Sequence, residues 1–123
     1  MSIAAAHASA FYREIAITSV IWAIKDDGGY PAPLNADGKR SMPFWSSELR
    51  AVKVISEVAA YKNFEVVAID WVIFCERWVP GLIRDGLLVG VNWSGKIASG
   101  YDIDPMELLQ NVVFNASKNI IDE

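Results

Sequence analysis

Hydrophobic positions along the chain repeat with two different spacings, which predict helices and strands in turn. Residues Ser2 to Ile15 are predicted to form a helix, because apolar side chains recur at the i, i+3, i+4, i+7 spacing of one buried stripe, at Ala8, Phe11, Tyr12 and Ile15. The β-branched and aromatic run from Ser19 to Lys25 predicts a strand. That strand ends in the turn Asp26-Asp27-Gly28-Gly29, where glycine supplies the positive φ that tight turns need.

The stretch from Asp26 to Ser41 has no hydrophobic period and carries Pro31, Pro33 and the turn signal Asn35-Ala36-Asp37-Gly38. A connection of this length in a small domain favours a functional or ligand-facing loop. The alternative is an extended hairpin in which Tyr30 to Leu34 is an edge strand that tolerates proline.

Two further strand–helix pairs are predicted in the middle of the chain. Met42 to Trp45 is a short strand, followed by a helix capped by Ser46 or Ser47 whose buried side is Leu49, Val52, Ile55 and Ala59. Phe64 to Ile69 is the next strand, and Asp70 caps a helix with Trp71, Phe74, Cys75 and Trp78 on one face. We expect that helix to break at Pro80, and the turn after Pro80 to end at Gly86.

The C-terminal third predicts a hairpin and a helix. Leu87 to Trp93 alternates, with Leu87, Val89, Val91 and Trp93 pointing one way and Leu88, Gly90 and Asn92 the other. Ser94-Gly95 then turns the chain into a partner strand, Ile97 to Tyr101. Asp104-Pro105-Met106-Glu107 is a helix-start pattern, and the buried face that follows is Leu108, Leu109, Val112 and Val113.

The predicted order is α-β-β-α-β-α-β-β-α over a single domain, residues 1–123. Adjacent hairpins favour antiparallel pairing. We therefore expect an α+β fold, with helices packed on a mostly antiparallel sheet of about four to five strands.

Composition places the chain among folded, soluble proteins. Hydrophobic residues make up 53% and charged residues 21%, so a disordered chain is excluded. The longest apolar run, Ile15 to Ile24, is shorter than the ~18 residues of a membrane span. The net charge of −4 argues against a nucleic-acid partner. No signal peptide is visible at the N-terminus, and we expect a cytoplasmic protein.

The residue types and their spacing do not indicate a catalytic site or a metal site. Cys75 falls on an apolar stripe and His7, the one histidine, has no evident catalytic partner, so no catalytic residue, metal site or cofactor is predicted. The pairs Asp26-Asp27 and Asp102/Asp104 are explained as turn and cap residues, with a cation or glycosidase-like role as the alternative. Gly90 to Ile97 matches most of a phosphate-binding loop, but Ile97 replaces the Ser or Thr and a strand is expected to follow instead of a helix.

Aromatic residues near strand ends are the strongest candidates for a functional surface. Trp22, Trp45 and Trp93 each lie beside a polar turn. They either fill the core or, with charged and polar neighbours, form a recognition patch. The candidate binding residues are Trp22, Asp26, Asp27, Lys39, Arg40, Trp45, Asn92, Trp93 and Tyr101.

Four stretches of the chain carry a family resemblance: Trp22 to Pro33, Gly38 to Ser47, Arg77 to Gly95 and Gly100-Tyr101-Asp102, within roughly Phe11 to Leu109. In these stretches the chain resembles a bacterial family known as domain of unknown function 2750. The resemblance implies a small bacterial cytoplasmic protein and supplies no catalytic or ligand residues. The predicted layout is also similar to that of small α+β immunity and regulatory proteins, an analogy at the level of fold alone.

Three hypotheses of function follow. The first is a non-enzymatic module, of immunity type or regulatory, that binds another protein through a rim formed by the Asp26–Arg40 loop and the Trp93–Tyr101 hairpin. The second is a small-molecule-binding protein or enzyme with a pocket under the 26–40 loop, anchored by Asp26, Asp27, Lys39 or Arg40. The third is a homodimer that uses the aromatic rim as its subunit interface.

Overall fold

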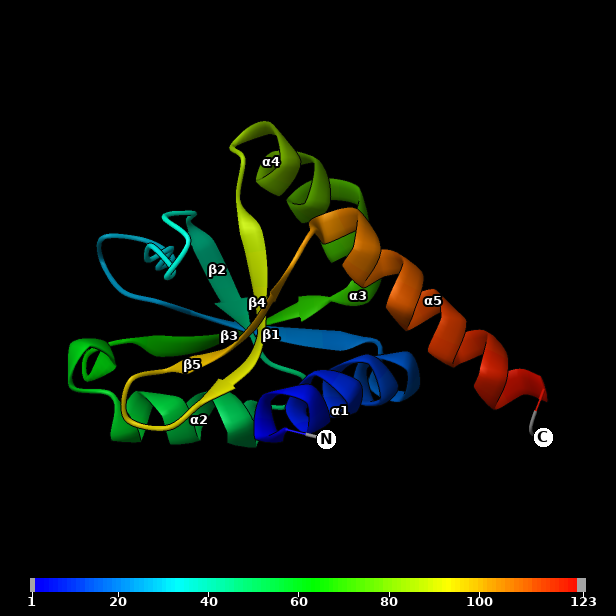
Figure 1. The fold of residues 1–123 in the computed structure, drawn as a ribbon, viewed down its shortest axis with the longest axis horizontal. Coiled ribbons are helices and arrows are strands. Elements are labelled where there is room, and N and C mark those ends of the chain that lie inside the picture. Colours follow the sequence, from blue (N-terminus) through cyan, green and yellow to red (C-terminus); the bar gives the residue numbers. More distant parts are fainter. Residues whose placement is uncertain (1, 122–123) are drawn as a thin grey trace.

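Helices and strands follow one another in the order that the hydrophobic pattern predicts (Figure 1). The computed structural model describes residues 2–121. Its strands are β1 (Val20–Lys25), β2 (Ser41–Phe44), β3 (Glu65–Asp70), β4 (Leu88–Ser94) and β5 (Ser99–Ile103). Its helices are α1 (Ile3–Thr18), α2 (Glu48–Glu57), α3 (Trp71–Ile73), α4 (Val79–Arg84) and α5 (Pro105–Ile121), with a 3-10 turn, η1 (Ala59–Tyr61), and a π-helical turn, η2 (Phe74–Trp78).

The strands form two small sheets that meet at a pair of tryptophans. β1 and β3 are antiparallel, while β4 lies between the parallel β2 and the antiparallel β5. The backbone N–H groups of Trp22 and Trp45 each donate to the carbonyl of the other at 2.8 Å, which joins the sheets. The predicted α+β fold with mostly antiparallel strands is confirmed. The strands are divided between two sheets because β2 reaches β1 only through this single bridge.

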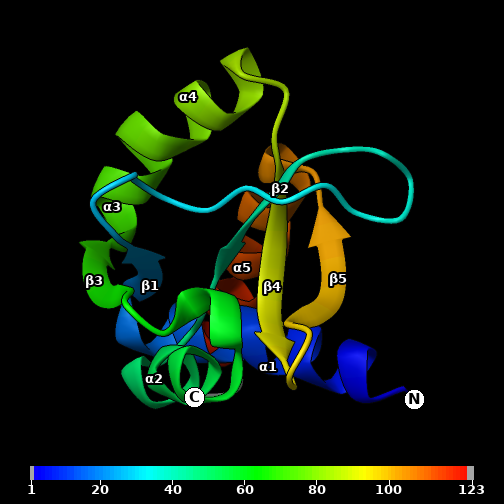
Figure 2. The same ribbon diagram turned by 90° about the vertical axis from the view of Figure 1, so that its left-hand side faces the viewer.

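Two apolar clusters fill the space between helices and strands. The larger lies among α1, α5 and the strands and contains Phe11, Ile15, Phe44, Phe74 and Leu108. The second contains Trp45, Trp93, Ala51, Val54 and Tyr61 and lies under α2. Figure 2 shows the long loop after β1 crossing in front of β2 and β4 toward the β5 side.

The buried face of α2 differs from the predicted one. Leu49 is 80% exposed and Val52 is 44% exposed, whereas Ala51 and Val54 are buried. Both stripes have helical spacing, so the sequence pattern alone does not choose between them. The structure buries the stripe that carries the small Ala51 in the second cluster, beside Trp45.

The predicted break at Pro80 is absent, and helical backbone runs from Trp71 to Arg84 through the π-helical turn η2. In that turn the Val79 N–H donates to the Phe74 carbonyl, five residues back. The wider turn just before Pro80 lets the helix pass a residue that has no N–H to donate. Gly86, at φ +68°, ends the helix as predicted, with the Leu87 N–H donating to the Leu82 carbonyl.

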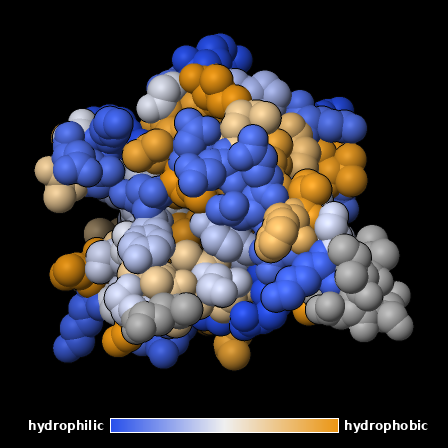
Figure 3. Space-filling view, turned by 45° about the vertical axis from the view of Figure 1, so that its right-hand side comes forward, coloured by the Kyte–Doolittle hydropathy of each residue, from blue (hydrophilic) through white to orange (hydrophobic). Residues whose placement is uncertain are grey.

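α5 begins at Pro105, with Asp104 as the predicted cap, because the Met106 N–H donates to Asp104 Oδ1. Leu108 and Val112 are buried, but Val113, which was expected on the same face, is 58% exposed. On the side of the molecule toward which α5 runs, hydrophobic side chains are interspersed with hydrophilic ones (Figure 3). None of the helices within residues 2–121 is both long and apolar enough to cross a membrane.

Strand β4 departs from simple alternation at Asn92, whose φ is +50°. The pairing register with β5 shifts between Val91 and Ser94, as in a β-bulge. The Trp93 ring consequently lies over Gly90, on the face opposite to the predicted one. The predicted alternation is therefore correct up to Val91 and wrong beyond it.

Candidate functional site

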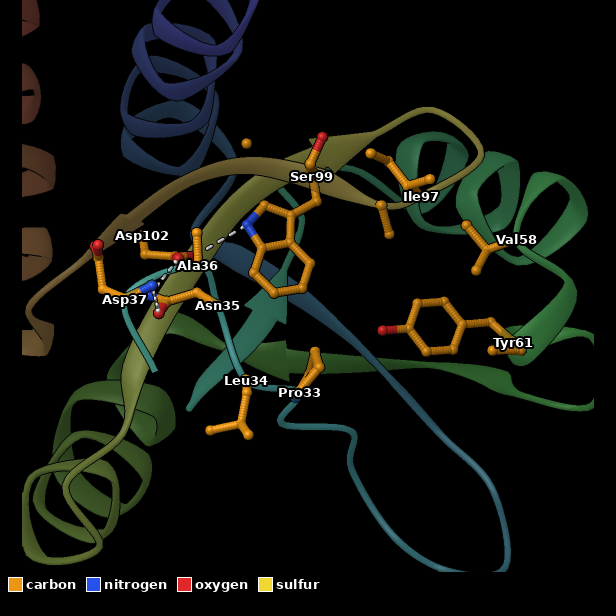
Figure 4. A pocket seen from close by; sticks show the side chains of 14 residues that line it. Pro33, Leu34, Asn35, Ala36, Asp37, Val58, Tyr61, Ile97, Ser99 and Asp102 are labelled. Carbon is orange, nitrogen blue, oxygen red and sulfur yellow. Dashed lines mark hydrogen bonds between the residues drawn. The ribbon is translucent and has the colours of Figure 1, made fainter. Parts of the chain in front are cut away.

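A groove of about 480 Å³ opens between three segments that are far apart in the sequence (Figure 4). One wall is the loop after β1, residues 33–37, and the opposite wall is the β4–β5 hairpin, residues 97–102. The third side is the end of α2 and η1, with Val58, Ala60 and Tyr61. The predicted loop and hairpin therefore do share one surface.

The floor of the groove includes the indole of Trp93, which is only 6% exposed. Its Nε1 donates to the Tyr101 carbonyl at 3.3 Å and to Asp102 Oδ1 at 3.2 Å. The ring has room to lie across the two strands because Gly90 and Gly100 carry no side chain beneath it. The floor is thus held in one orientation by hydrogen bonds and by the absence of two Cβ atoms.

Asp102 ties the loop wall to the hairpin wall. Its Oδ2 accepts from Asn35 Nδ2 at 3.0 Å, and its Oδ1 accepts from Ser41 Oγ at 2.8 Å as well as from the indole of Trp93. Asn35 Oδ1 in turn accepts from the backbone N–H groups of Asp37 and Lys39. The 33–37 wall is therefore an ordered loop, and the predicted edge strand at Tyr30 to Leu34 reduces to a bridge between Leu34 and Arg40.

Two large apolar side chains lie exposed at the mouth of the groove. Leu34 on the loop is 60% exposed and Ile97 on the hairpin turn is 83% exposed. They come from the two opposite walls of the groove (Figure 4). We call Leu34 and Ile97 the two lips.

Tyr61 contributes a hydroxyl to the third side of the groove. The residue is 8% exposed, and its hydroxyl points into the groove in Figure 4. No residue among those the structure describes hydrogen-bonds this hydroxyl. Burial raises its pKa above the ordinary value of a tyrosine, so it is neutral at physiological pH and available as a donor.

The three tryptophans expected near the rim belong to the core or its edge. Trp45 is fully buried, and its Nε1 donates to the Trp93 carbonyl at 2.8 Å. Trp22 is half-buried against the second cluster, and Trp93 alone lines the groove. Trp22 and Trp45 therefore fill the core, as one of the two predicted alternatives has it. Trp93 fits both alternatives, because it is buried and also lines the groove.

The charged candidates lie away from the groove. Asp26 and Asp27 are exposed in a turn, where Asp26 Oδ1 accepts from the Gly28 N–H. Lys39 and Arg40 line a separate hollow of about 490 Å³ beside Asp85 and Asp104. Tyr101, 47% exposed, borders a further hollow between α1 and α5.

Asn92, another candidate, is a buried structural residue. It is 2% exposed, and its Oδ1 accepts from the Ser46 backbone N–H at 2.9 Å. Its Nδ2 donates to the His7 carbonyl and to Ser46 Oγ. Asn92 thus joins α1, the β2–α2 connection and β4, and it does not reach the groove.

The histidine has a polar neighbour that sequence reasoning missed. Ser94 Oγ and His7 Nδ1 lie 3.3 Å apart, at the end of β4 and on α1. A serine beside a histidine is the start of a nucleophile–base arrangement, but within residues 2–121 no carboxylate hydrogen-bonds His7 to orient it. The same described residues contain no cluster of three His, Cys, Asp or Glu side chains that would suit a metal ion.

The residues that sequence reasoning missed in the groove are Leu34, Ile97, Tyr61 and Asp37. Leu34 and Ile97 lie inside or next to predicted turns, where side chains are expected to be exposed. A large apolar residue at such a position is the sequence signal that could have identified them. Tyr61 lies shortly after the helix predicted from Ser46 or Ser47, and nothing local marks its hydroxyl. Its role depends on segments more than 20 residues away in both directions.

Comparison with models of protein families gives a match over most of the chain. The family model described as "Protein of unknown function (DUF2750)" matches residues 8–112. No curated protein matches the chain. The matched range includes every residue that lines the groove.

Proposed function

The chain belongs to the DUF2750 family, and we propose that it is a bacterial, cytoplasmic, non-enzymatic module that binds another protein through the groove between residues 33–37, 58–61 and 97–102. An immunity-type or regulatory role fits such a module, because either role requires recognition of a partner and no chemistry. In this proposal the binding surface is the groove with its two lips, and not the predicted rim of tryptophans and charged residues.

The observation that carries the proposal is the pair of exposed lips around a rigid floor. Leu34 and Ile97 place large apolar side chains in solvent on opposite walls of the groove, whose floor includes Trp93. Partner-binding hot spots are enriched in tryptophan at a desolvated centre, surrounded by contacts that exclude water. Burying both lips removes apolar surface from water, at about 25 cal/mol per Å².

A small-molecule-binding protein is the second candidate, and one observation favours it. The groove volume of about 480 Å³ lies in the range of small-ligand pockets. A small ligand enclosed there would leave much of Leu34 and Ile97 in solvent, since both project from the mouth. A protein partner accounts for the lips as well as for the groove, and we favour it for that reason.

The test is a comparison of two double variants. Leu34→Ser with Ile97→Ser removes both lips, while Ile3→Ser with Leu49→Ser removes two comparably exposed side chains outside the groove. Each tagged protein is used to capture partners from the native host. A captured protein is then purified and its direct binding is measured by calorimetry.

The expected result is that wild type and the Ile3/Leu49 control bind the same protein directly, and that the Leu34/Ile97 variant binds it more than about tenfold more weakly. Equal binding by all three proteins would show that the groove is not the surface used. If the captured protein is the same chain, the molecule is a homodimer and the proposal is wrong. If only a small molecule copurifies with wild type, the second candidate replaces the first.

A further inference from the structure

The side chains that line the groove indicate what kind of segment it binds. This inference rests on the proposed function. We propose that the groove binds an extended peptide segment of another protein, with an apolar side chain against Trp93, a backbone carbonyl on the Tyr61 hydroxyl and a lysine or arginine facing Asp37. Trp93 belongs to the floor, Tyr61 to the side formed by the end of α2 and η1, and Asp37 to the loop wall. Each makes its own prediction about the segment that is bound.

The Tyr61 hydroxyl is the first contact. The Tyr61 side chain is mostly buried, but its hydroxyl opens into the groove and makes no hydrogen bond with any residue from 2 to 121. The hydroxyl is therefore available to a group that enters from outside. An extended backbone presents carbonyl oxygens along its whole length, and a neutral tyrosine donates to them well.

The charges of the groove are the second contact. Among the described residues that line it, Asp37 and Asp102 carry all the charge, and both are acidic. Asp102 already accepts hydrogen bonds from Asn35, Ser41 and Trp93. Asp37 is exposed, and its carboxylate makes no hydrogen bond or ion pair with any residue from 2 to 121. The carboxylate of Asp37 is therefore free to form an ion pair with a cationic side chain of the partner.

The indole of Trp93 is the third contact. Its ring is fixed over Gly90 and held by Asp102, so it offers a flat apolar surface that does not need to reorganise on binding. Leu34 and Ile97 are exposed on the walls beside this floor and can contact an inserted apolar side chain.

Charge also separates a foreign segment from a second copy of this chain. The chain has a net charge of −4, so two copies repel each other and an acidic groove is poorly matched to an acidic protein. A basic and apolar segment has the complementary charge. We therefore expect a foreign segment in the groove, and the experiment also tests for self-association of the chain.

The experiment selects peptides from a phage-displayed library of random linear peptides against the full-length protein. Selected peptides are synthesised, and their affinity for purified variants is measured by fluorescence anisotropy at low and high salt. The variants are Tyr61→Phe, Asp37→Asn, the Leu34→Ser/Ile97→Ser pair and, as control, Leu49→Ser. Sedimentation of the free protein reports whether copies associate.

We expect selected peptides to share an apolar residue within a few positions of a lysine or arginine. Tyr61→Phe should weaken their binding roughly 3- to 10-fold, as expected for one lost hydrogen bond. Asp37→Asn should weaken it about 2- to 5-fold at low salt and by less at high salt. The lip variant should lose more than about tenfold, and Leu49→Ser should bind as wild type does.

Other outcomes overturn the inference in distinguishable ways. If the lip variant loses binding but Tyr61→Phe and Asp37→Asn do not, the groove binds a protein and the peptide chemistry proposed here is wrong. Selected peptides without a basic residue would have the same meaning. Binding of an extended peptide is excluded if no peptide is selected, or if selected peptides bind the lip variant as well as wild type. In that case, the binding of the captured protein to wild type and to the lip variant shows whether the groove is used. Self-association abolished by the lip variant would replace the foreign segment with a second copy.

Discussion

The indole ring of Trp93 lies directly over Gly90 of its own strand. A Cβ atom built on Gly90 would be 2.3 Å from Cε2 of that ring, closer than non-bonded carbon atoms approach. Gly90 is therefore the residue that allows Trp93 to form the floor of the groove. The two residues are three positions apart, and only the bulge at Asn92 brings them onto one face.

Gly90→Ala should destabilise the protein by about 2–3 kcal/mol, because the hydrogen bonds of the ring prevent it from moving aside. Urea unfolding measures the change. Gly81→Ala is the matched control, since its Cβ would meet Arg84 Nη2 at an ordinary 3.7 Å and alanine favours helix. Equal urea midpoints for wild type and Gly90→Ala would contradict the placement of the ring.

Asn92 supplies both a backbone conformation and a set of hydrogen bonds, and two substitutions separate them. Asn92→Gly keeps φ +50° accessible but removes the bonds to Ser46 and His7, and should cost about 2 kcal/mol. Asn92→Ala removes the same bonds and adds about 1 kcal/mol of left-handed backbone strain. Thermal and urea unfolding give both values. Asn63→Ala, at an exposed position, should change neither. If alanine is tolerated as well as glycine, the strain assigned to this position is wrong.

Local chemistry explains why the order of elements was predictable. Ser47, Asp70 and Asp104 cap the helices that follow them, and each cap is read from residues within one turn. The α2 face was predicted correctly at Ile55, which packs against the second cluster, but wrongly at Leu49 and Val52, because two stripes satisfy the same spacing. The break at Pro80 was predicted wrongly because a π-helical turn accommodates the missing N–H, which proline alone does not signal.

The site depended on contacts that no local pattern encodes. Asn92 adopts its positive φ while its side chain bonds residues 46 and 85 positions away, and that choice reverses the face of Trp93. Alternation could predict only the opposite face. The loop and hairpin were expected to form one surface, and they do. Tyr61, which completes that surface, enters from a third segment.

Glu14 links α1 to α2 through Arg50, whose Nη2 lies 3.0 Å from Glu14 Oε2. Partial burial alone would raise the pKa of Glu14, but hydrogen bonds from Arg50 and Ser46 and the nearby arginine charges outweigh it and leave the pKa lowered. A carboxyl whose pKa is lower in the folded state stabilises the fold above its unfolded pKa. That stability is lost as the pH falls through the folded value.

Glu14→Gln should therefore cost about 0.5–1 kcal/mol at neutral pH, as expected for a partly exposed ion pair. The difference from wild type should shrink below the ordinary carboxyl pKa and vanish in more acidic buffer. Urea unfolding across this pH range measures it. The exposed Arg84–Asp85 pair is the control, and Asp85→Asn should have little effect at any pH. A difference that is constant with pH would mean that the charge of Glu14 contributes nothing.

Cys75 should react slowly with alkylating reagents. Burial is the main cause of its raised pKa, with the negative charges of Glu76 and Asp70 adding to it. Since the thiolate is the reactive form, the rate at neutral pH should be well below that of an unfolded cysteine. The pH dependence of iodoacetamide labelling, with the urea-unfolded chain as reference, gives the apparent pKa. A fast reaction at neutral pH would show an activated thiol and reopen a catalytic role.

Tyr61→Phe should leave the free energy of unfolding within about 0.5 kcal/mol of wild type, because the hydroxyl has no partner among residues 2–121 to lose. Trp45→Phe provides the contrast: it removes a bonded N–H and leaves space in the core, and should cost about 2–4 kcal/mol. Urea unfolding compares the two, and the alkaline difference spectrum of wild type minus Tyr61→Phe should show a phenol that ionises above the ordinary tyrosine value. If Tyr61→Phe instead destabilises the fold by more than about 1 kcal/mol, the hydroxyl is already engaged inside the molecule. It would then not be the free donor that a partner's backbone requires.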